Sequence, residues 1–239
     1  MTTQDVQFTF PSNAAAVRET MGRKVSTANS KMPGSSFATD PFQCNVGSQL
    51  RDVEGSVCSK CYAIRLAKMR PSVRQGYAAN EAAMRDASMC KGIIRERFVQ
   101  GMADQIRRAA VKTGELYHRW FDAGDLSSAD ELELIADIAR ETPEIAHWLP
   151  TREVSAVRDY CKRGALPDNL TVRISATMID AEPNVSRGMR ANNVQSSTVH
   201  TKGRLYVGHC CPASQQGNSC GDCRACWNRN VSNVSYPAH

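Results

Sequence analysis

The sequence predicts an α/β fold, built on a partial, (β/α) barrel-like parallel sheet with a cysteine-rich C-terminal segment. Between residues 117 and 178, three apolar segments alternate with two amphipathic ones. Strands separated by helices at this spacing are typical of βα units, whose strands pair in parallel. Eight of the ten cysteines fall into two groups, and the second group occupies residues 210–226.

The N-terminal part is expected to be mostly helical. A helix is predicted near Asn13–Met21, whereas residues 36–57 are expected to form a loop because Pro and Gly interrupt them. Residues 60–112 are rich in Ala, Met, Arg, Glu and Gln, which favour helix. Breaks in this helical region are expected near Pro71 and around residues 90–92.

The middle of the chain carries the alternating pattern. The expected strands are Tyr117–Ala123, Ile145–Leu149 and Leu170–Met178. The helix between the first two strands begins at a capping box formed by Ser128 and Glu131, and it ends before Pro143. The second helix, Glu153–Arg163, is followed by Gly164, a residue type that favours helix C-caps.

A single domain is expected over residues 1–239. It is divided into an N-terminal extension (1–35), a βα core that holds the first cysteine group (36–182) and a cysteine-rich C-terminal segment (183–239). Residues 180–203 are polar and predict no element. Two further strands are expected at Arg204–Val207 and Val231–Tyr236.

The composition is that of a globular protein, with 41% apolar and 23% charged residues. No apolar run approaches the roughly 18–20 residues that span a bilayer. The first residues lack a basic stretch followed by an apolar one, which argues against a secretory signal. We therefore expect a cytoplasmic protein with no membrane partner, and disfavour a membrane protein, a secreted disulfide scaffold and a coiled coil.

Charge is unevenly distributed along the chain, whose net charge is +6. Residues 58–112 hold twelve Lys or Arg against four Asp or Glu, whereas residues 113–182 hold seven against fourteen. A basic region of this kind permits binding of an anionic partner, nucleic acid included. The alternative is a set of solvated helix faces that complement one another.

The second cysteine group resembles a metal site. Cys220, Cys223 and Cys226 form a C-x2-C-x2-C run, which lets consecutive thiolates converge on one iron–sulfur cluster. Cys211, which precedes a proline, is the nearest fourth ligand, and Cys210 competes with it. Zinc is the alternative, although zinc sites more often use two separated C-x2-C pairs.

The first cysteine group consists of Cys44, Cys58 and Cys61, with no local fourth cysteine. Three thiolates can hold a 4Fe–4S cluster that leaves one iron open for a small molecule, or a fourth ligand from Cys90, Cys210 or His209 can complete the site. A helix is expected to begin directly after Cys61, and its N-terminus favours the negative charge of thiolates or of a cluster.

Candidate cofactor-binding residues lie at or near strand ends. Gly124 and Asp125 follow the first expected strand, Thr151 and Arg152 follow the second, and Arg173 lies in the third. Active residues of barrel folds occupy the carboxyl ends of strands. Asp125 could serve in acid–base chemistry, bind an amino or ribose group, or cap a helix. The arginines suit a carboxylate or phosphate, or an ordinary ion pair.

Several of these segments resemble the bacteriophage "gene product 88" domain family. The resemblance extends from about residue 31 over nearly all of the remaining chain. It implies a phage or prophage origin, and hence the cytoplasm of a host cell. The segments that carry it are Lys31–Ser35, Cys58–Ala63, Arg119–Leu126, Trp148–Arg152, Cys220–Cys226 and Val234–His239.

A more distant resemblance is to the radical S-adenosylmethionine (radical SAM) enzymes. The chain shares with them a cysteine triple ending in C-x2-C-Tyr, a helix, and a strand that ends in Gly-Asp-Leu. The resemblance implies one 4Fe–4S cluster at the first cysteine group, S-adenosylmethionine held near Gly124 and Asp125, and an auxiliary cluster at the second group. The gap between Cys44 and Cys58 is thirteen residues, against three in the common pattern of that superfamily.

The sequence thus leaves three functions open. The first is an iron–sulfur protein with one or two clusters that acts as a radical-SAM-like oxidoreductase or lyase on an unknown substrate. The second is a non-catalytic iron–sulfur protein with a redox or structural role. The third is a zinc-stapled protein that binds nucleic acid through residues 58–112.

Overall fold

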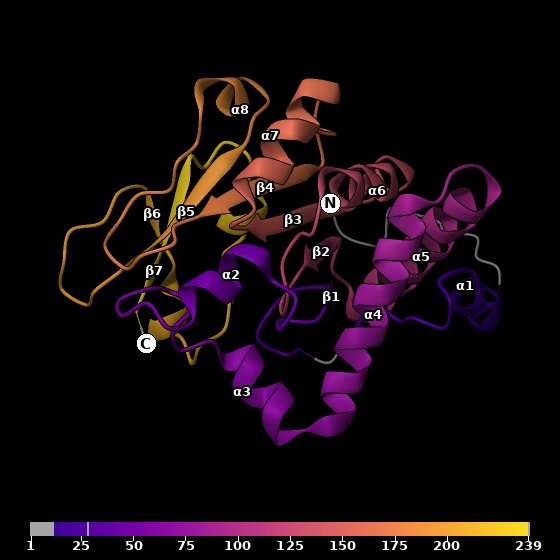
Figure 1. The fold of residues 1–239 in the computed structure, drawn as a ribbon, viewed down its shortest axis with the longest axis horizontal. Coiled ribbons are helices and arrows are strands. Elements are labelled where there is room, and N and C mark those ends of the chain that lie inside the picture. The colour runs from indigo at the N-terminus through magenta and orange to yellow at the C-terminus, as the bar shows by residue number, and fades with distance from the viewer. Residues whose placement is uncertain (1–11, 28, 239) are drawn as a thin grey trace.

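The chain folds around one open, entirely parallel β-sheet (Figure 1). The computed structural model describes residues 12–27 and 29–238, in which seven strands lie in the order β1-β2-β3-β4-β5-β7-β6, every neighbouring pair parallel. The strands are β1 (Ser35–Phe37), β2 (Tyr117–Trp120), β3 (Ala146–Thr151), β4 (Leu170–Ser175), β5 (Gln195–His200), β6 (His209–Cys210) and β7 (Asn233–Pro237). The expected α/β class and parallel sheet are confirmed, and the sheet does not close.

Helices connect most of the strands. They are α1 (Asn13–Glu19), α2 (Asn45–Leu50), α3 (Tyr62–Met69), α4 (Pro71–Met89), α5 (Ile93–Thr113), α6 (Ala129–Glu141), α7 (Val154–Arg163) and α8 (Arg187–Ala191). Two short 3-10 helices, η2 (Pro212–Gln215) and η3 (Ala225–Trp227), lie in the C-terminal segment. The expected breaks are confirmed: Pro71 occupies the first turn of α4, where its missing N–H costs nothing, and Gly92 precedes α5.

Two segments contain elements that the sequence did not predict. The expected loop at residues 36–57 holds the end of β1 and all of α2, and the polar stretch 180–203 holds all of α8 and β5. Conversely, Arg204–Val207 is not a strand but an exposed connection, in which Leu205 is fully exposed. Its apolar residues resemble a strand pattern, yet they have no core to face.

The two faces of the sheet differ in chemistry. On one side, which we call the helix face, Leu149, Val172 and Ile174 pack with α4, α5, α6 and α7 in the main hydrophobic core. On the other side, the cysteine face, Trp148 packs against residues 225–234 in a second, smaller core. The cysteine-rich segment therefore covers the side of the sheet that these four helices leave open.

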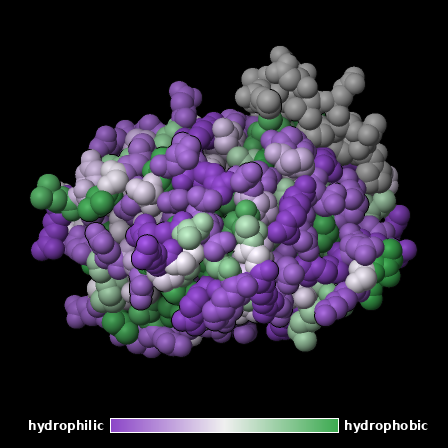
Figure 2. Space-filling model, turned by 90° about the horizontal axis from the view of Figure 1, so that it is seen from above, coloured by the Kyte–Doolittle hydropathy of each residue, from purple (hydrophilic) through white to green (hydrophobic). Residues whose placement is uncertain are grey.

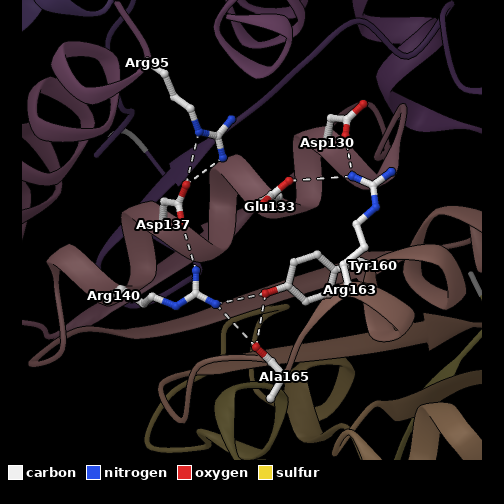
Figure 3. Close-up of polar contacts among 8 residues, drawn as sticks. All are labelled: Arg95, Asp130, Glu133, Asp137, Arg140, Tyr160, Arg163 and Ala165. Carbon is white, nitrogen blue, oxygen red and sulfur yellow. Dashed lines mark hydrogen bonds and ion pairs between the residues drawn. The ribbon is translucent and has the colours of Figure 1, made fainter. Parts of the chain in front are cut away.

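Ion pairs join the outer surfaces of α5, α6 and α7 (Figure 3). Asp137 of α6 accepts from Arg95 at 2.6 Å and from Arg140 at 2.8 Å, and Arg140 also donates to the Tyr160 hydroxyl at 3.1 Å. Arg163 of α7 pairs with Asp130. Because most of these groups are partly exposed, each pair contributes at most about 1 kcal/mol, and the network mainly sets the register of the helices.

The surface offers no membrane-spanning segment in the part of the chain that the structure describes, because no helix there is both long and apolar enough. Seen from above, the molecule presents mainly hydrophilic residues, with apolar ones in small, separate groups (Figure 2). This face shows no broad apolar patch of the kind that marks a docking site.

The predicted capping box at the start of α6 is confirmed. Ser128 Oγ accepts from the Glu131 N–H at 3.2 Å. The Glu131 carboxylate reaches back to the N–H of Ser127 at 2.6 Å. Glu131 has no exposed surface, and burial raises its pKa to about 7, with a further contribution from the charge of Glu81. The cap therefore places an ionisable group where its charged form is unfavourable.

Glu131→Gln is expected to stabilise the protein at neutral pH. Between about pH 4.5 and 7 the folded state keeps a proton that the unfolded state releases, so the free energy of unfolding falls as pH rises through this window. Glutamine keeps an acceptor for Ser127 without this loss. We expect a gain of about 2 kcal/mol near pH 8 and almost none near pH 4.5, measured by urea unfolding. The exposed Glu133→Gln on the same helix is the control, and an equal effect at both pH values would contradict the account.

Candidate metal centres

The first cysteine group lies at the carboxyl edge of the sheet, in the segment that follows β1. Cys44 is the N-cap of α2, and Cys61 is the N-cap of α3. The intervening segment crosses to the end of β4, where the Val57 N–H donates to the Thr177 carbonyl at 3.0 Å. Glu153, directly after β3, accepts from the first turn of α2 at 2.8 Å. Contacts to β3 and β4 thus hold the three cysteines at this edge.

The three thiols share one environment. The sulfur atoms of Cys44 and Cys58 both lie 3.7 Å from the position that a Cβ atom would occupy at Gly47. Burial raises the pKa of the Cys44 thiol, and the negative charges of Asp125, Cys61 and Cys58 raise it further. Because Gly47 has no side chain, the space next to both sulfur atoms stays open.

Gly124 and Asp125 lie beside these cysteines. Gly124 has a φ of +83°, and a Cβ there would come within 2.8 Å of the Thr39 carbonyl carbon, so only glycine fits. The buried Asp125 carboxylate accepts from the N–H of Leu126 at 2.8 Å and from the N–H of Arg152 at 3.0 Å. Burial raises the pKa of Asp125 and hydrogen bonds oppose that rise. Asp125 thus ties the end of β2 to the end of β3.

Thr151 and Arg152 complete this edge. The Thr151 hydroxyl hydrogen-bonds to Asp125 and accepts from the Glu153 N–H at 3.0 Å. Arg152 Nε donates to the Ala176 carbonyl at 3.3 Å, and its two terminal nitrogens form no hydrogen bond or ion pair with the described residues. Four of the five predicted cofactor-binding residues therefore lie with the first cysteine group.

Arg173 is the exception, and the structure corrects its expected position. It lies on the cysteine face with no exposed surface, not at the strand end. Its guanidinium donates five hydrogen bonds of 2.8–3.1 Å, and every acceptor is a backbone carbonyl. The acceptors belong to Ser196, Ala225, Cys226, Asn228 and Val231. Because no donor remains for a ligand, Arg173 anchors the C-terminal segment to the sheet.

The second cysteine group assembles on the cysteine face. Its backbone is fixed at several points: the Cys211 N–H donates to the Ser235 carbonyl and the Cys220 N–H to the Lys31 carbonyl, each at 2.8 Å. Burial raises the pKa of the Cys220 thiol, and the charges of Cys211 and Cys223 add to it. These thiols are therefore close enough to act on one another.

Cys226 is the most deeply buried member of this group. Its sulfur lies 3.2 Å from the Tyr236 hydroxyl. Burial raises the pKa of Cys226 to about 12, and the charge of Cys211 contributes to that rise. Cys211 is thus coupled to all three members of the C-x2-C-x2-C run. Cys210 lies in β6, and its thiol is directed at the Cys211 carbonyl at 4.0 Å.

The remaining cysteines and histidines are outside these groups or at their margin. Cys161 packs against the main core, and Cys90 caps the end of α4. His209 Nε2 lies 3.4 Å from the Cys223 sulfur. In residues 12–27 and 29–238, no three His, Cys, Asp or Glu side chains converge tightly enough to hold a single metal ion.

Arg119, on the cysteine face of β2, is a residue that sequence reasoning missed. Its guanidinium stacks on the Trp148 ring at 4.6 Å. Burial raises the pKa of the Cys220 and Cys226 thiols and of the Tyr62 phenol, and the Arg119 charge opposes the rise in all three. Arg119 therefore acts on the second cysteine group and on Tyr62, the residue that follows Cys61 of the first. The sequence signal that could have identified Arg119 is the presence of an arginine among aromatic residues in an expected strand.

Comparison with known proteins gives one match. A family model described as "Gene product 88" matches residues 19–229. No curated protein and no solved structure matches the chain, and nothing in these comparisons links it to the radical SAM enzymes. The matched region includes the whole of β1–β6, α2–α8 and both cysteine groups. The chain belongs to the gene product 88 family.

Proposed function

We propose that this protein holds two 4Fe–4S clusters and uses the first to bind S-adenosylmethionine, as a radical-SAM-like enzyme. The observation that carries the proposal is the division of seven cysteines into a group of three and a group of four. The ligands would be Cys44, Cys58 and Cys61 for the first cluster and Cys211, Cys220, Cys223 and Cys226 for the second. Four thiolates saturate a cluster, whereas three leave one iron free for a small molecule.

The position of the first group supports the enzymatic part of the proposal. The three cysteines follow β1, and Gly124 and Asp125 follow β2, the neighbouring strand. The carboxyl edge of a parallel sheet is where ligands of such folds bind. When bound, a cluster with one open iron would supply the electron that cleaves the cofactor. The terminal nitrogens of Arg152 are available to bind a carboxylate of the ligand. The Asp125 carboxylate holds the backbone of Arg152 in place by accepting from its N–H. Gly124, which has no side chain, lets the backbone after β2 pass close to Thr39.

The donor set also favours iron–sulfur over zinc. Structural zinc sites more often take their thiolates from two separated C-x2-C pairs. Cys220, Cys223 and Cys226 instead form one C-x2-C-x2-C run with Cys211 nearby in the sequence, which is the ligand pattern of an iron–sulfur cluster.

Anaerobic purification followed by iron, sulfide and zinc analysis tests the proposal. We expect a brown protein with about eight iron and eight sulfide per chain. S-adenosylmethionine should then change the EPR signal of the reduced protein, and reductant should yield 5′-deoxyadenosine or methionine. A colourless, zinc-containing protein would overturn the proposal. About eight iron without any response to S-adenosylmethionine would refute the enzymatic part and leave a redox or structural role.

A further inference from the structure

A cluster of unpaired cations lies next to the first cysteine group. Between Cys58 and Asn80 the chain has five Lys or Arg and no Asp or Glu, and this stretch forms α3 and the first half of α4 at the bottom of Figure 1. With one arginine from the end of α2, these residues form what we call the basic surface. It comprises Arg51, Lys60, Arg65, Lys68, Arg70 and Arg74.

The cations of the basic surface have no acidic partners within the described residues. Arg51 is half-buried and the other five are exposed. None of them belongs to an ion pair, whereas cations of α5, α6 and α7 do. The helix dipole of α3 favours positive charge at its C-terminal end, which explains the positions of Lys68 and Arg70. It does not explain the positions of Arg65, Arg74 or Arg51.

Two of these arginines are brought together without a counter-charge. Arg51 and Arg74 both face the Phe42 ring, with their guanidinium carbons 5.6 and 4.8 Å from its centre. Arg51 Nε is buried and has no hydrogen-bond partner within the described chain, although a terminal nitrogen donates to the Pro41 carbonyl at 2.6 Å. Two like charges at one ring repel each other, and an anion between them removes the repulsion.

The basic surface continues to the candidate cluster site. At one end, Arg51 is the C-cap of α2, whose N-cap is Cys44. At the other end, α3 begins directly after Cys61. A long anion bound along α3 and α4 therefore reaches the carboxyl edge of the sheet, where the first cysteine group lies.

We infer that the basic surface binds the phosphate backbone of a single-stranded nucleic acid. Guanidinium groups bind phosphate in a bidentate manner, and the cations are spread along the surface, as a repeating anion requires. Two aromatic side chains lie among them: Phe42, and Tyr62, whose surface is 54% exposed. Bases of an unpaired strand stack on such rings. Binding itself is independent of the clusters, whereas nucleic acid as the substrate of the enzyme rests on the proposed function.

The chemistry of the surface favours nucleic acid over a lipid membrane. Membrane-surface helices present a continuous apolar face alongside their cations. In α3, by contrast, Ala63 and Ala67 are buried in the protein, and Met69 is the one large apolar residue of this helix, besides Tyr62, that is strongly exposed. The surface therefore offers charge and two aromatic rings, but no apolar face to insert.

A binding assay with matched charge variants tests the inference. The probes are fluorescent single-stranded DNA and RNA of about 16 nucleotides, titrated with the anaerobically purified full chain from about 50 to 200 mM salt. The test variant is Arg65→Gln/Lys68→Gln/Arg70→Gln. The control is Arg187→Gln/Arg190→Gln/Lys202→Gln, which removes the same charge from exposed residues outside the basic surface. Vesicles of phosphatidylserine and phosphatidylcholine are tested in parallel.

We expect the test variant to bind at least tenfold more weakly at low salt, with a log–log salt slope smaller by about 2, and the control to bind like the unmodified protein. Cys58→Ala, which removes a proposed cluster ligand, should still bind, so a failure of the cluster proposal would not be mistaken for a failure here. Absence of binding to either oligonucleotide, or equal weakening in both triple variants, would overturn the inference. Binding to vesicles alone would overturn it in favour of a membrane surface.

Discussion

Arg173→Met is expected to detach the cysteine-rich segment from the sheet and to lower the free energy of unfolding by about 4 kcal/mol. Arg173 has no exposed surface and donates to five backbone carbonyls, four of them in residues 225–231. Methionine fills much of the volume but leaves these acceptors buried without donors, and each unsatisfied group costs about 1–3 kcal/mol before relaxation. Urea unfolding measures the loss.

Two further observations separate this effect from a general weakening of the fold. Arg229→Met removes an arginine from the same segment, but its partner Asp168 is fully exposed, so we expect a change below about 1 kcal/mol. In Arg173→Met, Trp227 should become more exposed and its fluorescence should shift to longer wavelength. Equal stability of the two variants would contradict an anchoring role for Arg173.

Cys58→Ala is expected to remove the first cluster and every response to S-adenosylmethionine, while the second cluster remains. Iron should fall from about eight to about four per chain, because a pair of cysteines does not retain a four-iron cluster. Iron and sulfide analysis together with EPR of the reduced protein measures the change. The complementary Cys223→Ala should lose the other half of the iron and keep the response to S-adenosylmethionine.

The control for this pair is Cys161→Ala, because Cys161 is half-buried on α7 and belongs to neither cysteine group. We expect it to keep all of its iron. Complete loss of iron in Cys58→Ala would show that one cluster takes ligands from both groups. Unchanged iron would show that Cys58 is not a ligand.

The middle of the fold could be predicted because its signals are local. The helix expected from the capping box at Ser128 is α6, and its buried face includes Leu132 and Ile135. The strands on either side are apolar on at least one face because they pack in the main core. Hydrophobic periodicity and capping residues reflect such contacts directly, so the alternation of strands and helices could be predicted from the sequence.

Strands β1 and β5 could not be predicted, for a physical reason. The strand β1 is three residues long, too short for a periodic pattern. In β5, the polar side chains of Ser196, Thr198 and His200 line a cavity of about 500 Å³ together with residues of β7. Without an apolar face, β5 is stabilised by its neighbours in the sheet, and a single sequence does not reveal those neighbours.

The grouping of the cysteines could be predicted from the sequence better than the residues that support them, and the role of these cysteines as metal ligands stays a prediction. Spacing identified the cysteines, and strand ends identified Asp125 and Arg152, which lie where expected. Arg173 and Arg119 show the limit of that reasoning. Both are arginines in strands. All hydrogen-bond donors of the Arg173 guanidinium are used by backbone carbonyls, whereas the Arg119 guanidinium stacks on a tryptophan. Residue type alone does not distinguish an anchor from a residue that acts on the cysteines.

The position of β7 determines when the second cysteine group can form. Although β7 follows β6 in the chain, it lies between β5 and β6, so β6 has no partner until β7 has been synthesised. The Cys211 N–H likewise awaits the Ser235 carbonyl. On the ribosome, Cys211 therefore takes its place beside the other cysteines of this group only after β7 has been translated. The four ligands that we propose for the second cluster are thus brought together last, whereas the contacts that hold the first group lie earlier in the chain.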